Sequence, residues 1–183
     1  MIPRDLILQN EKVLLRPMSR HDFSVLQELT KDPDQWIYFT QDLSKAEDFE
    51  EWVSGHFSGE RLQFVVIDKI SGKIAGATAF GNFSPRDQRL EIGWTWIGKD
   101  FQGTGVNAQM KKVMLDYCFE VLKLKRVEIK TDVLNIPARK ALLKIGATEE
   151  GILRSHTQMT HGRRRDTIYY SFLEGEWPKT TGN

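Results

Sequence analysis

The segment that decides the fold reads Ile97-Gly98-Lys99-Asp100-Phe101-Gln102-Gly103-Thr104-Gly105-Val106-Asn107-Ala108. It joins a predicted strand to a predicted helix through a loop with three glycines. The first four N–H groups of a helix have no partner inside it, and the helix dipole places partial positive charge there. Glycines let the backbone come close to an anion. The segment therefore predicts a phosphate site, although an ordinary glycine-rich loop between a strand and a helix would have the same composition.

Regular hydrophobic patterns flank this segment. Over 88–97, large apolar residues alternate with small or polar ones, which predicts a half-buried strand with Glu91 on the face opposite the large apolar residues. Over 106–121, apolar residues recur at helical spacing, and Lys111 and Lys112 fall outside that apolar stripe. Alternation resumes over 127–132. One strand–helix–strand crossover is therefore predicted, and it should be right-handed.

The other predicted elements surround that crossover. Strands are predicted over 12–16, 62–68, 74–80, 151–159 and 167–173, and helices over 19–31, 44–58 and 135–145. Antiparallel hairpins lie on both sides of the crossover. The predicted fold class is therefore α/β, with a mixed, mostly antiparallel sheet of about seven strands and helices on both faces. No linker divides the sequence, so residues 1–183 are expected to form a single domain.

Composition and charge set the broad class. The chain has 183 residues, of which 40% are hydrophobic and 28% charged, as in soluble globular proteins. Its formal net charge of +1 gives no support to a dedicated nucleic-acid binder. The single cysteine, Cys118, cannot form an internal disulfide. No apolar run approaches the ~18 to 20 residues of a membrane-spanning helix. We therefore expect a cytoplasmic protein that partners neither membranes nor nucleic acid.

Other phosphate-binding motifs can be compared with the same segment. It has no Gly-Lys-Ser/Thr, which excludes a P-loop. Gly103-Thr104-Gly105-Val106-Asn107-Ala108 fits the dinucleotide pattern G-x-G-x-x-G/A, and Glu128 follows about 20 residues later. A Rossmann domain is therefore a competing interpretation. Against it, only a strand, a short helix and a hairpin follow the motif helix, which leaves no room for a doubly wound nucleotide domain.

Several short segments, in a fixed order, carry a resemblance to a known family. Gln102-Gly103-Thr104-Gly105-Val106-Asn107 resembles the acyl-CoA signature Q/R-x-x-G-x-G/A of the GNAT acetyltransferase superfamily. The likeness is closest to the RimJ/RimL type and covers nearly the whole chain. Further matching segments are Val13-Leu14-Leu15-Arg16-Pro17, Glu91-Ile92-Gly93-Trp94, Asn135, Lys144-Ile145-Gly146-Ala147, Glu150-Gly151-Ile152-Leu153-Arg154 and 166–177.

The resemblance implies a site for acetyl-CoA, with coenzyme A as product. The cofactor would lie between strand 88–97 and the next strand, which are expected to part beyond Trp96. Backbone amides would hold its pyrophosphate, namely those of Gln102, Gly103, Thr104, Gly105, Val106 and Asn107. Backbone groups near Trp96 and Ile97 would hold the pantetheine and the thioester, and Asn135 would hydrogen-bond the cofactor arm. Arg139 and Lys144 are candidate contacts for the adenosine phosphate.

Two positions depart from the family pattern. Asn107 stands where glycine or alanine is usual, so the start of the helix must accommodate a larger side chain. Ala138 stands where RimJ/RimL proteins often carry a serine proposed to protonate the leaving thiolate, and alanine cannot do this. The acid for that step therefore stays unassigned, with Tyr169 and Tyr170 as weak candidates.

The implied reaction is direct attack of a neutral amine on a thioester. An ammonium must first lose a proton to a carboxylate or an ordered water, and backbone N–H groups must stabilise the oxyanion. Glu91 is the candidate base, because it is acidic, lies on the signature strand and faces away from the large apolar residues. A solvated carboxylate or a partner of Arg89 would show the same pattern, so both interpretations stay open.

We therefore predict an N-acetyltransferase that moves the acetyl group of acetyl-CoA to a primary amine, either a protein N-terminus or a small amine. The alternative is a non-catalytic acyl-CoA-binding or RNA-associated module that uses the turn Arg163-Arg164-Arg165, although a solvated hairpin tip would have the same sequence. No metal is expected, because His156 and His161 have no Cys or Glu at ligand spacing. A homodimer is compatible with the resemblance, since dimers are common among similar proteins.

Overall fold

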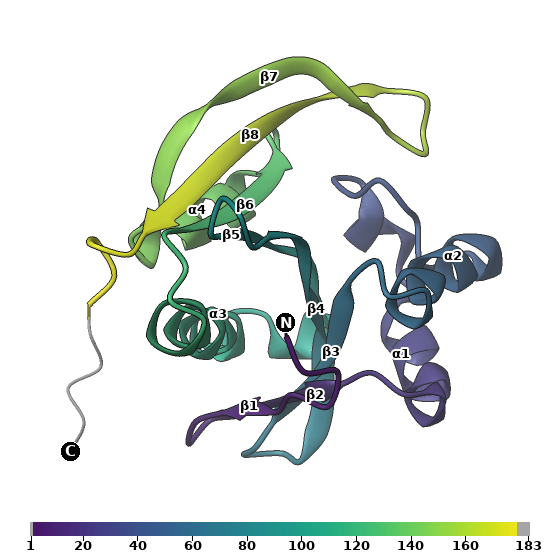
Figure 1. The fold of residues 1–183 in the computed structure, drawn as a ribbon. Coiled ribbons are helices and arrows are strands. Elements are labelled where there is room, and N and C mark those ends of the chain that lie inside the picture. Colours follow the sequence, from purple (N-terminus) through teal and green to yellow (C-terminus); the bar gives the residue numbers. More distant parts are fainter. Residues whose placement is uncertain (1, 179–183) are drawn as a thin grey trace.

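A computed structural model describes residues 2–178, and its central feature is one sheet of eight strands (Figure 1). The strands are β1 (Leu8–Gln9), β2 (Val13–Pro17), β3 (Leu62–Asp68), β4 (Lys73–Ser84), β5 (Arg89–Ile97), β6 (Arg126–Asp132), β7 (Thr148–Gln158) and β8 (Arg164–Leu173). They lie in the order β1-β2-β3-β4-β5-β6-β8-β7, and all neighbours are antiparallel except the parallel pair β5–β6. The predicted fold class is confirmed. Residues 1 and 179–183 of the expected single domain lie outside the described residues.

Helices cover both faces of the sheet. The helices α1 (Phe23–Leu29) and α2 (Ala46–Phe57) lie on one face, and α3 (Val106–Asp116) lies on the other (Figure 1). Helix α4 (Ile136–Lys144) follows β6. Shorter helical turns occur at Arg20–Asp22, Pro33–Trp36 and Lys99–Phe101, and a π-helical turn at Tyr117–Val121 extends α3. None of the described helices is long and apolar enough to cross a membrane.

The strands differ from the predicted ones at several points. The sequence pattern missed β1, because two residues are too short to show an alternation. The turn between β7 and β8 lies at 159–163, so Arg164 and Arg165 belong to β8 and not to the turn in which they were expected. In Figure 1 the β7–β8 hairpin arches over the sheet, with its turn on the side of α1 and α2.

The two faces of the sheet bury different cores. On the α3 face, Met110 belongs to the same hydrophobic cluster as Ile92 of β5. On the other face, Trp96 of β5 packs against Trp36 and Trp52, with ring centroids 5.8 and 5.9 Å apart. The alternation predicted that Trp96 and Ile92 share a face, but in the structure they lie on opposite faces. The cause is a bulge in β5, where the register with β4 shifts, because one extra residue in a strand reverses the faces beyond it.

Strands β5 and β6 are paired over three residues only. Arg89 to Glu91 pair with Arg126 to Glu128, and among the described residues no strand pairs with this edge of β5 beyond Glu91. Strand β5 stays paired with β4 as far as Ile97, while β6 follows β8 to Asp132. The two strands thus part after Glu91, earlier than the predicted parting beyond Trp96. The bulge at Trp94, which has a φ of +51°, bends β5 at this point.

Candidate active site

The glycine-rich segment predicted to bind phosphate forms the start of α3. Gly103 and Gly105 have φ angles of +75° and +91°, which glycine adopts without strain. Gly105 precedes the helix without any side-chain cap, and the buried Val106 anchors the first turn. The first helical amide with a backbone acceptor is that of Gln109, bonded to the Gly105 carbonyl at 3.1 Å. Within the described residues, the amides of 103–108 therefore donate to no protein acceptor, as an anion site requires.

Three side chains surround this loop. Gln102 donates from Nε2 to the carbonyl of Ile97 at 3.1 Å, which ties the loop to the end of β5. Asn107 fits at the helix start, and its Oδ1 is buried without a hydrogen-bond partner in the described chain. Lys12 donates from Nζ to the carbonyl of Thr104 at 2.7 Å, so an ammonium group lies beside the loop. Sequence reasoning missed Lys12, because it comes from the other end of the chain.

Strand β5 presents an unpaired edge after its parting from β6. Gly98 donates its backbone N–H to Ala75 of β4 at 2.8 Å. Successive residues of a strand point their backbone groups to alternate sides, so those of Trp96 face β4, and those of Thr95 and Ile97 face the open edge. The Trp96 indole lies in the aromatic core. The backbone groups of Ile97 thus face the edge along which the pantetheine arm was predicted to lie, whereas those of Trp96 face β4.

Glu91 is the last residue of β5 that pairs with β6, and it lies on the face opposite α3, as predicted. Its side chain is buried, and its Oε2 accepts from Asn82 Nδ2 at 2.7 Å and from Lys130 Nζ at 2.9 Å. Glu91 is therefore not a solvated carboxylate. Nor is it a partner of Arg89, which pairs with Glu128 at 3.5 Å. Its position and contacts suit a carboxylate held in one orientation at the parting.

A second buried charge lies on the α3 face of the parting. Lys111 is 4% exposed, and its Nζ donates to Thr95 Oγ1 at 2.7 Å. Thr95 Oγ1 in turn lies 2.7 Å from Thr78 Oγ1, so hydroxyl groups are the nearest polar neighbours of the ammonium. Burial lowers the pKa of Lys111 to about 7, and the charge of Glu91 opposes this shift. The helical pattern over 106–121 placed Lys111 outside the buried stripe, which is wrong.

The three arginines near the β7–β8 turn point in different directions. Arg163 pairs with the carboxylate of Asp132, which is fully buried. Arg164 is exposed. Arg165 is buried, and its Nε donates to Thr167 Oγ1 at 2.9 Å. Residues 160–162 of the turn are exposed, as expected for a solvated hairpin tip. Because Arg163 is ion-paired and Arg165 is buried, Arg164 is the exposed arginine of the three on which the RNA-associated alternative depends.

Helix α4 holds the remaining predicted site residues. Asn135 caps the helix as predicted, since its Oδ1 accepts from the Ala138 N–H at 3.2 Å. No described residue accepts from its Nδ2, which stays available at the end of β6. Arg139 is bonded to the hydroxyl of Tyr170 at 3.2 Å. Lys144 ends α4, about 13 Å along the helix axis from Asn135 at ~1.5 Å per residue. The structure thus brings Asn135 close to the parting, but not Lys144.

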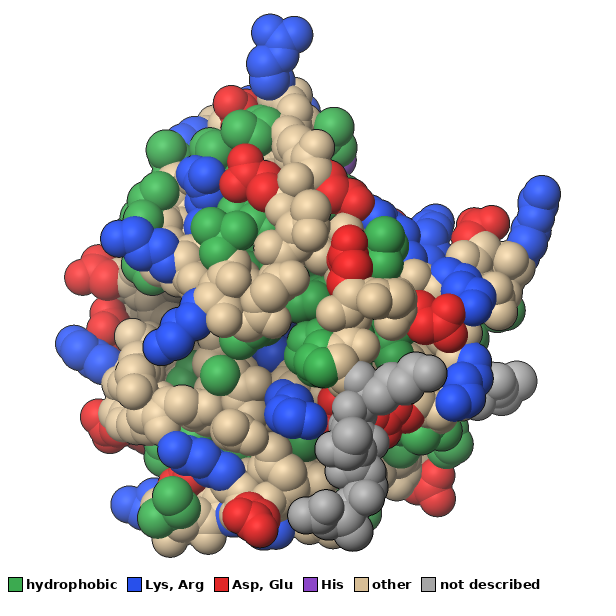
Figure 2. All heavy atoms as spheres, turned by 90° about the vertical axis from the view of Figure 1, so that its left-hand side faces the viewer, with side chains coloured by type: hydrophobic (Ala, Val, Ile, Leu, Met, Phe, Trp, Pro, Cys, Tyr) green, Lys and Arg blue, Asp and Glu red, His purple; other side chains and the backbone are tan. Residues whose placement is uncertain are grey.

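These groups fit a long ligand with an anionic end. Free amides lie at the start of α3, an unpaired strand edge leads away from them, and the buried Asn107 Oδ1 offers an acceptor. Figure 2 shows the face at the left of Figure 1, on which Lys and Arg side chains are interspersed with Asp and Glu side chains. A separate shallow cavity of about 330 Å³ lies between β1 and the C-terminal half of α3. That cavity is away from the free amides, so we place the candidate site at the parting of β5 and β6.

Comparison with known proteins identifies the family. The chain is 30% identical over 178 residues to a protein of Bacillus subtilis (strain 168) with the provisional name ribosomal N-acetyltransferase YdaF, which covers 92% of this chain and 94% of that protein. It is 25% identical over 166 residues to spermidine N(1)-acetyltransferase of Escherichia coli (strain K12), with 90% and 88% covered. A crystal structure of a GCN5-related N-acetyltransferase from Brucella melitensis has a TM-score of 0.88 and 29% identity, over 96% of this chain and 82% of that one. Residues 12–148 match the model of the acetyltransferase (GNAT) domain, so this chain belongs to the GNAT family and is an acetyltransferase.

Proposed function

We propose that this acetyltransferase transfers the acetyl group of acetyl-CoA to a primary amine. The observation that carries the proposal is the run of free amides from Gly103 to Asn107, at the edge where β5 parts from β6. Such amides bind the charge of a pyrophosphate, and the ammonium of Lys12 adds positive charge beside them. Acetyl-CoA, when bound, supplies a thioester at the far end of an arm that is long enough to enter the gap.

The two strands that part offer complementary groups to that arm. The backbone groups of Thr95 and Ile97 face the open edge of β5 and can extend the sheet by bonding to the amides of the arm. Asn107 Oδ1, which has no partner in the described chain, can accept an N–H of the arm. From the other side of the gap, Asn135 Nδ2 can donate while its Oδ1 caps α4. The predicted contacts of Arg139 and Lys144 with the adenosine phosphate stay proposals.

We propose that the amine reaches the thioester from the face opposite α3, the face on which the candidate base lies. Glu91 lies on this face at the point where the strands part. Asn82 and Lys130 both donate to its Oε2, which holds that oxygen in place. We propose that Glu91 takes the proton of the incoming amine through an ordered water. Backbone N–H groups beside the bulge at Trp94 are suited to stabilise the oxyanion.

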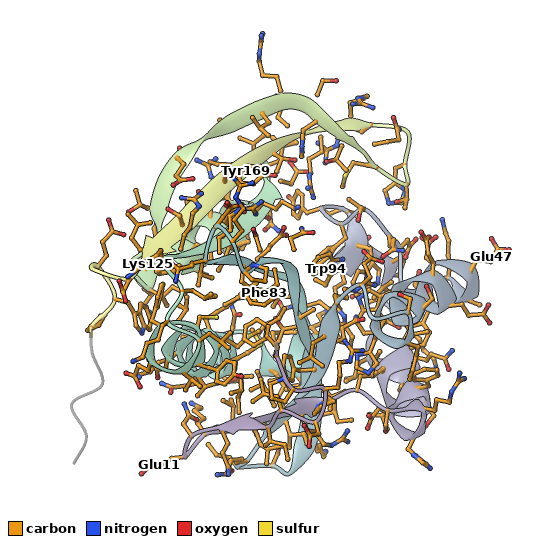
Figure 3. All side chains as sticks on the ribbon, viewed as in Figure 1. Glu11, Glu47, Phe83, Trp94, Lys125 and Tyr169 are labelled. Atoms are coloured by element: carbon orange, nitrogen blue, oxygen red, sulfur yellow. The ribbon has the colours of Figure 1, made fainter. Side chains whose placement is uncertain are left out.

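Charge on the face opposite α3 favours one class of acceptor. Figure 3 shows Trp94 and Tyr169 on the side over which the β7–β8 hairpin arches. Two acids of this region, Glu91 and Asp132, are already paired with Lys130 and Arg163. A polyamine carries several positive charges and needs unpaired carboxylates to bind them. We therefore propose an acceptor with one amine beside a neutral or anionic group, such as a protein N-terminus, as in enzymes of the RimJ/RimL type. The name of the YdaF relative points to this class, and that of the Escherichia coli relative points to spermidine.

A thiol-release assay with a panel of amines tests the proposal. The panel contains peptides with a free N-terminus, the same peptides with a blocked N-terminus and a free lysine, and spermidine. We expect the peptides with a free N-terminus to release coenzyme A fastest, and mass spectrometry to place the acetyl group on the α-amine. Faster turnover of spermidine would contradict the acceptor class. Absence of any acetyl-CoA binding by calorimetry would contradict the donor.

A further inference from the structure

We propose that Lys111 is the general acid that protonates the thiolate of coenzyme A as it leaves. This inference rests on the proposed donor, acetyl-CoA, and concerns the step whose acid stayed unassigned. Ala138 carries no acidic hydrogen. Tyr170, a weak candidate from the sequence, has its hydroxyl bonded to Arg139 and Glu149.

The amine of Lys111 lies beside the open edge of β5. Its Nζ is 2.7 Å from Oγ1 of Thr95, in the stretch of β5 that has no partner in β6. Lys111 comes five residues after Val106, so it lies about 7.5 Å along the axis from the start of α3. Thr95 Oγ1 also lies 3.3 Å from the carbonyl of Gly93, beside the bulge. A thioester arm that starts at the free amides and follows this edge therefore passes Nζ of Lys111 before it reaches Glu91.

The fold itself does not need a charge at this position. Among the described residues, no carboxylate lies within ion-pair distance of Lys111, and the nearby Glu91 is paired with Lys130. The next residue, Lys112, instead forms an ordinary helix-surface pair with Asp116 at 2.6 Å. Burial of an ammonium without a counter-charge is costly, and an apolar side chain would fill the same space without that cost. Buried groups of this kind are concentrated at sites where their protons are used.

The surroundings of Lys111 match its acidity to that of a thiol. Across the parting lie Glu91 on β5, Lys130 on β6 and Arg165 on β8, while β4 presents the hydroxyl of Thr78. Glu91 favours the protonated amine, but burial outweighs it and lowers the pKa of Lys111 to about 7. That value is below the ~8.5 of an ordinary alkyl thiol. Proton transfer from the ammonium to the thiolate is therefore favourable, and water can restore the proton near neutral pH.

The protons and electrons of the transfer balance. The neutral amine nitrogen forms a bond to the carbonyl carbon, and the carbon–sulfur bond breaks with its electron pair on sulfur. The nitrogen loses one proton to Glu91 or to the water that Glu91 holds. The sulfur receives one proton from Nζ of Lys111. The products are an amide and a free thiol, after which Lys111 takes a proton from solvent and Glu91 releases one.

Coenzyme A alone provides a test that needs neither an acceptor nor turnover. Ultraviolet absorbance of the thiolate is followed against pH for free coenzyme A and for its complexes with wild type, Lys111→Met and Lys112→Met. An ammonium within ~4 to 6 Å favours the ionised form of a neighbouring acid by about 1 to 3 units. Lys111 carries this charge only near and below about pH 7, so there the titration of the bound thiol should shift toward thiolate in wild type and in Lys112→Met, compared with free coenzyme A. In Lys111→Met this shift should vanish. A shift that persists in Lys111→Met overturns the inference and leaves the donor site intact. Absence of binding to wild type overturns both.

Kinetics with the best acceptor separates proton donation from simple charge. Lys111→Met should lower kcat by about 10²- to 10⁴-fold, the usual contribution of a general acid. Lys111→Arg keeps the positive charge, but its guanidinium does not release a proton near neutral pH, so its kcat should stay low. Recovery of the rate by arginine would assign Lys111 to electrostatics alone. A loss confined to acetyl-CoA affinity, with kcat unchanged, would make it a residue that holds the arm.

Discussion

Two arms of the molecule leave the sheet where β5 and β6 part, and their polar groups differ. In the arm formed by β5 and α3, the amides of 103–108 have no protein acceptor, and Lys111 is buried without a counter-charge at ion-pair distance in the described chain. In the arm formed by β6 and α4, Asp132 binds Arg163, and Asn135 caps the helix. Each helix follows one strand of the parallel pair β5–β6. The start of α3 is open, because its N–H groups have no protein acceptor, and the start of α4 is closed, because Asn135 caps it.

This difference indicates which part of the molecule binds the ligand and carries out the reaction. Hydrogen-bonded and paired groups stabilise the free protein, whereas buried polar groups without partners destabilise it unless a ligand binds them. The arm of β5 and α3 should therefore have the larger effects on binding and turnover. The arm of β6 and α4 should act chiefly on stability. Matched substitutions on the two arms test this division.

The largest effect is expected from Glu91→Gln. It should lower kcat by about 10²- to 10⁴-fold, with acetyl-CoA affinity kept, because the amide cannot accept the proton of the amine. Glu128 is the matched control, since it pairs with Glu91 in register and its carboxylate binds Arg126 at 2.8 Å. Steady-state kinetics should find Glu128→Gln close to wild type. Equal losses in both variants, or none in Glu91→Gln, would remove Glu91 from the mechanism.

Lys111→Met should separate stability from function. The pKa of Lys111 is lowered from 10.5 to about 7 in the folded protein, so between these values the unfolded chain binds more protons, and wild-type stability rises with pH. The methionine variant should therefore be more stable by a few kcal/mol near about pH 6, and the gain should shrink toward about pH 10. Urea unfolding across this range measures the gain, with Lys112→Met as the control. A variant less stable than wild type at every pH would make Lys111 a structural residue.

Gly105→Asp tests the open helix start. The carboxylate would face the phosphates, and a Cβ at this position would lie 3.2 Å from Lys12 Nζ, so the aspartate would also draw that cation away. Acetyl-CoA affinity should fall by at least ~10-fold, or roughly 1.4 kcal/mol. Gly146, after α4, has the same φ of +91° with nothing within 4 Å, so Gly146→Asp carries equal backbone strain on the other arm. Calorimetry should find near-normal affinity for Gly146→Asp. Equal losses would assign the effect to strain.

Features that depend on near neighbours in the chain could be predicted from the sequence. The loop with Gly103 and Gly105 and the cap at Asn135 are determined within a few residues, and each lies where it was expected. The face of Glu91 followed from the alternation before the bulge. Its partner Lys130 could not be found in this way, because the contact joins two strands that are far apart in sequence.

Two predictions from the sequence, the position of Lys111 outside the buried stripe and the face of Trp96, were wrong for different physical reasons. The burial of Lys111 left a signal, since Leu115 and Cys118 lie about one and two turns later on the same side of the helix and both are fully buried. The apolar side of α3 was thus wider than the stripe that was chosen. The position of Trp96 left no such signal, because the bulge at Trp94 depends on the pairing of β5 with β4.

The smallest effect should come from Asn135→Asp, which separates cap from ligand contact on the closed arm. The aspartate still accepts from the Ala138 N–H, so α4 stays capped and the protein should melt nearly as wild type. The substitution removes the Nδ2 donor, so acetyl-CoA binding should weaken by about one hydrogen bond, roughly 0.5 to 1.5 kcal/mol. Asn135→Ala is the comparison, because it also loses the cap and should cost about 0.5 to 2 kcal/mol of stability.

The affinity of Asn135→Asp, measured by calorimetry beside that of Gly105→Asp, decides how strictly the two arms are divided. An affinity equal to wild type would mean that the closed arm gives no donor to the ligand and serves as scaffold alone. A loss smaller than that of Gly105→Asp fits one contact across the gap, added to the main site at the start of α3. A loss larger than that of Gly105→Asp would contradict the division between the two arms. The capped helix start would then carry more of the binding free energy than the open one.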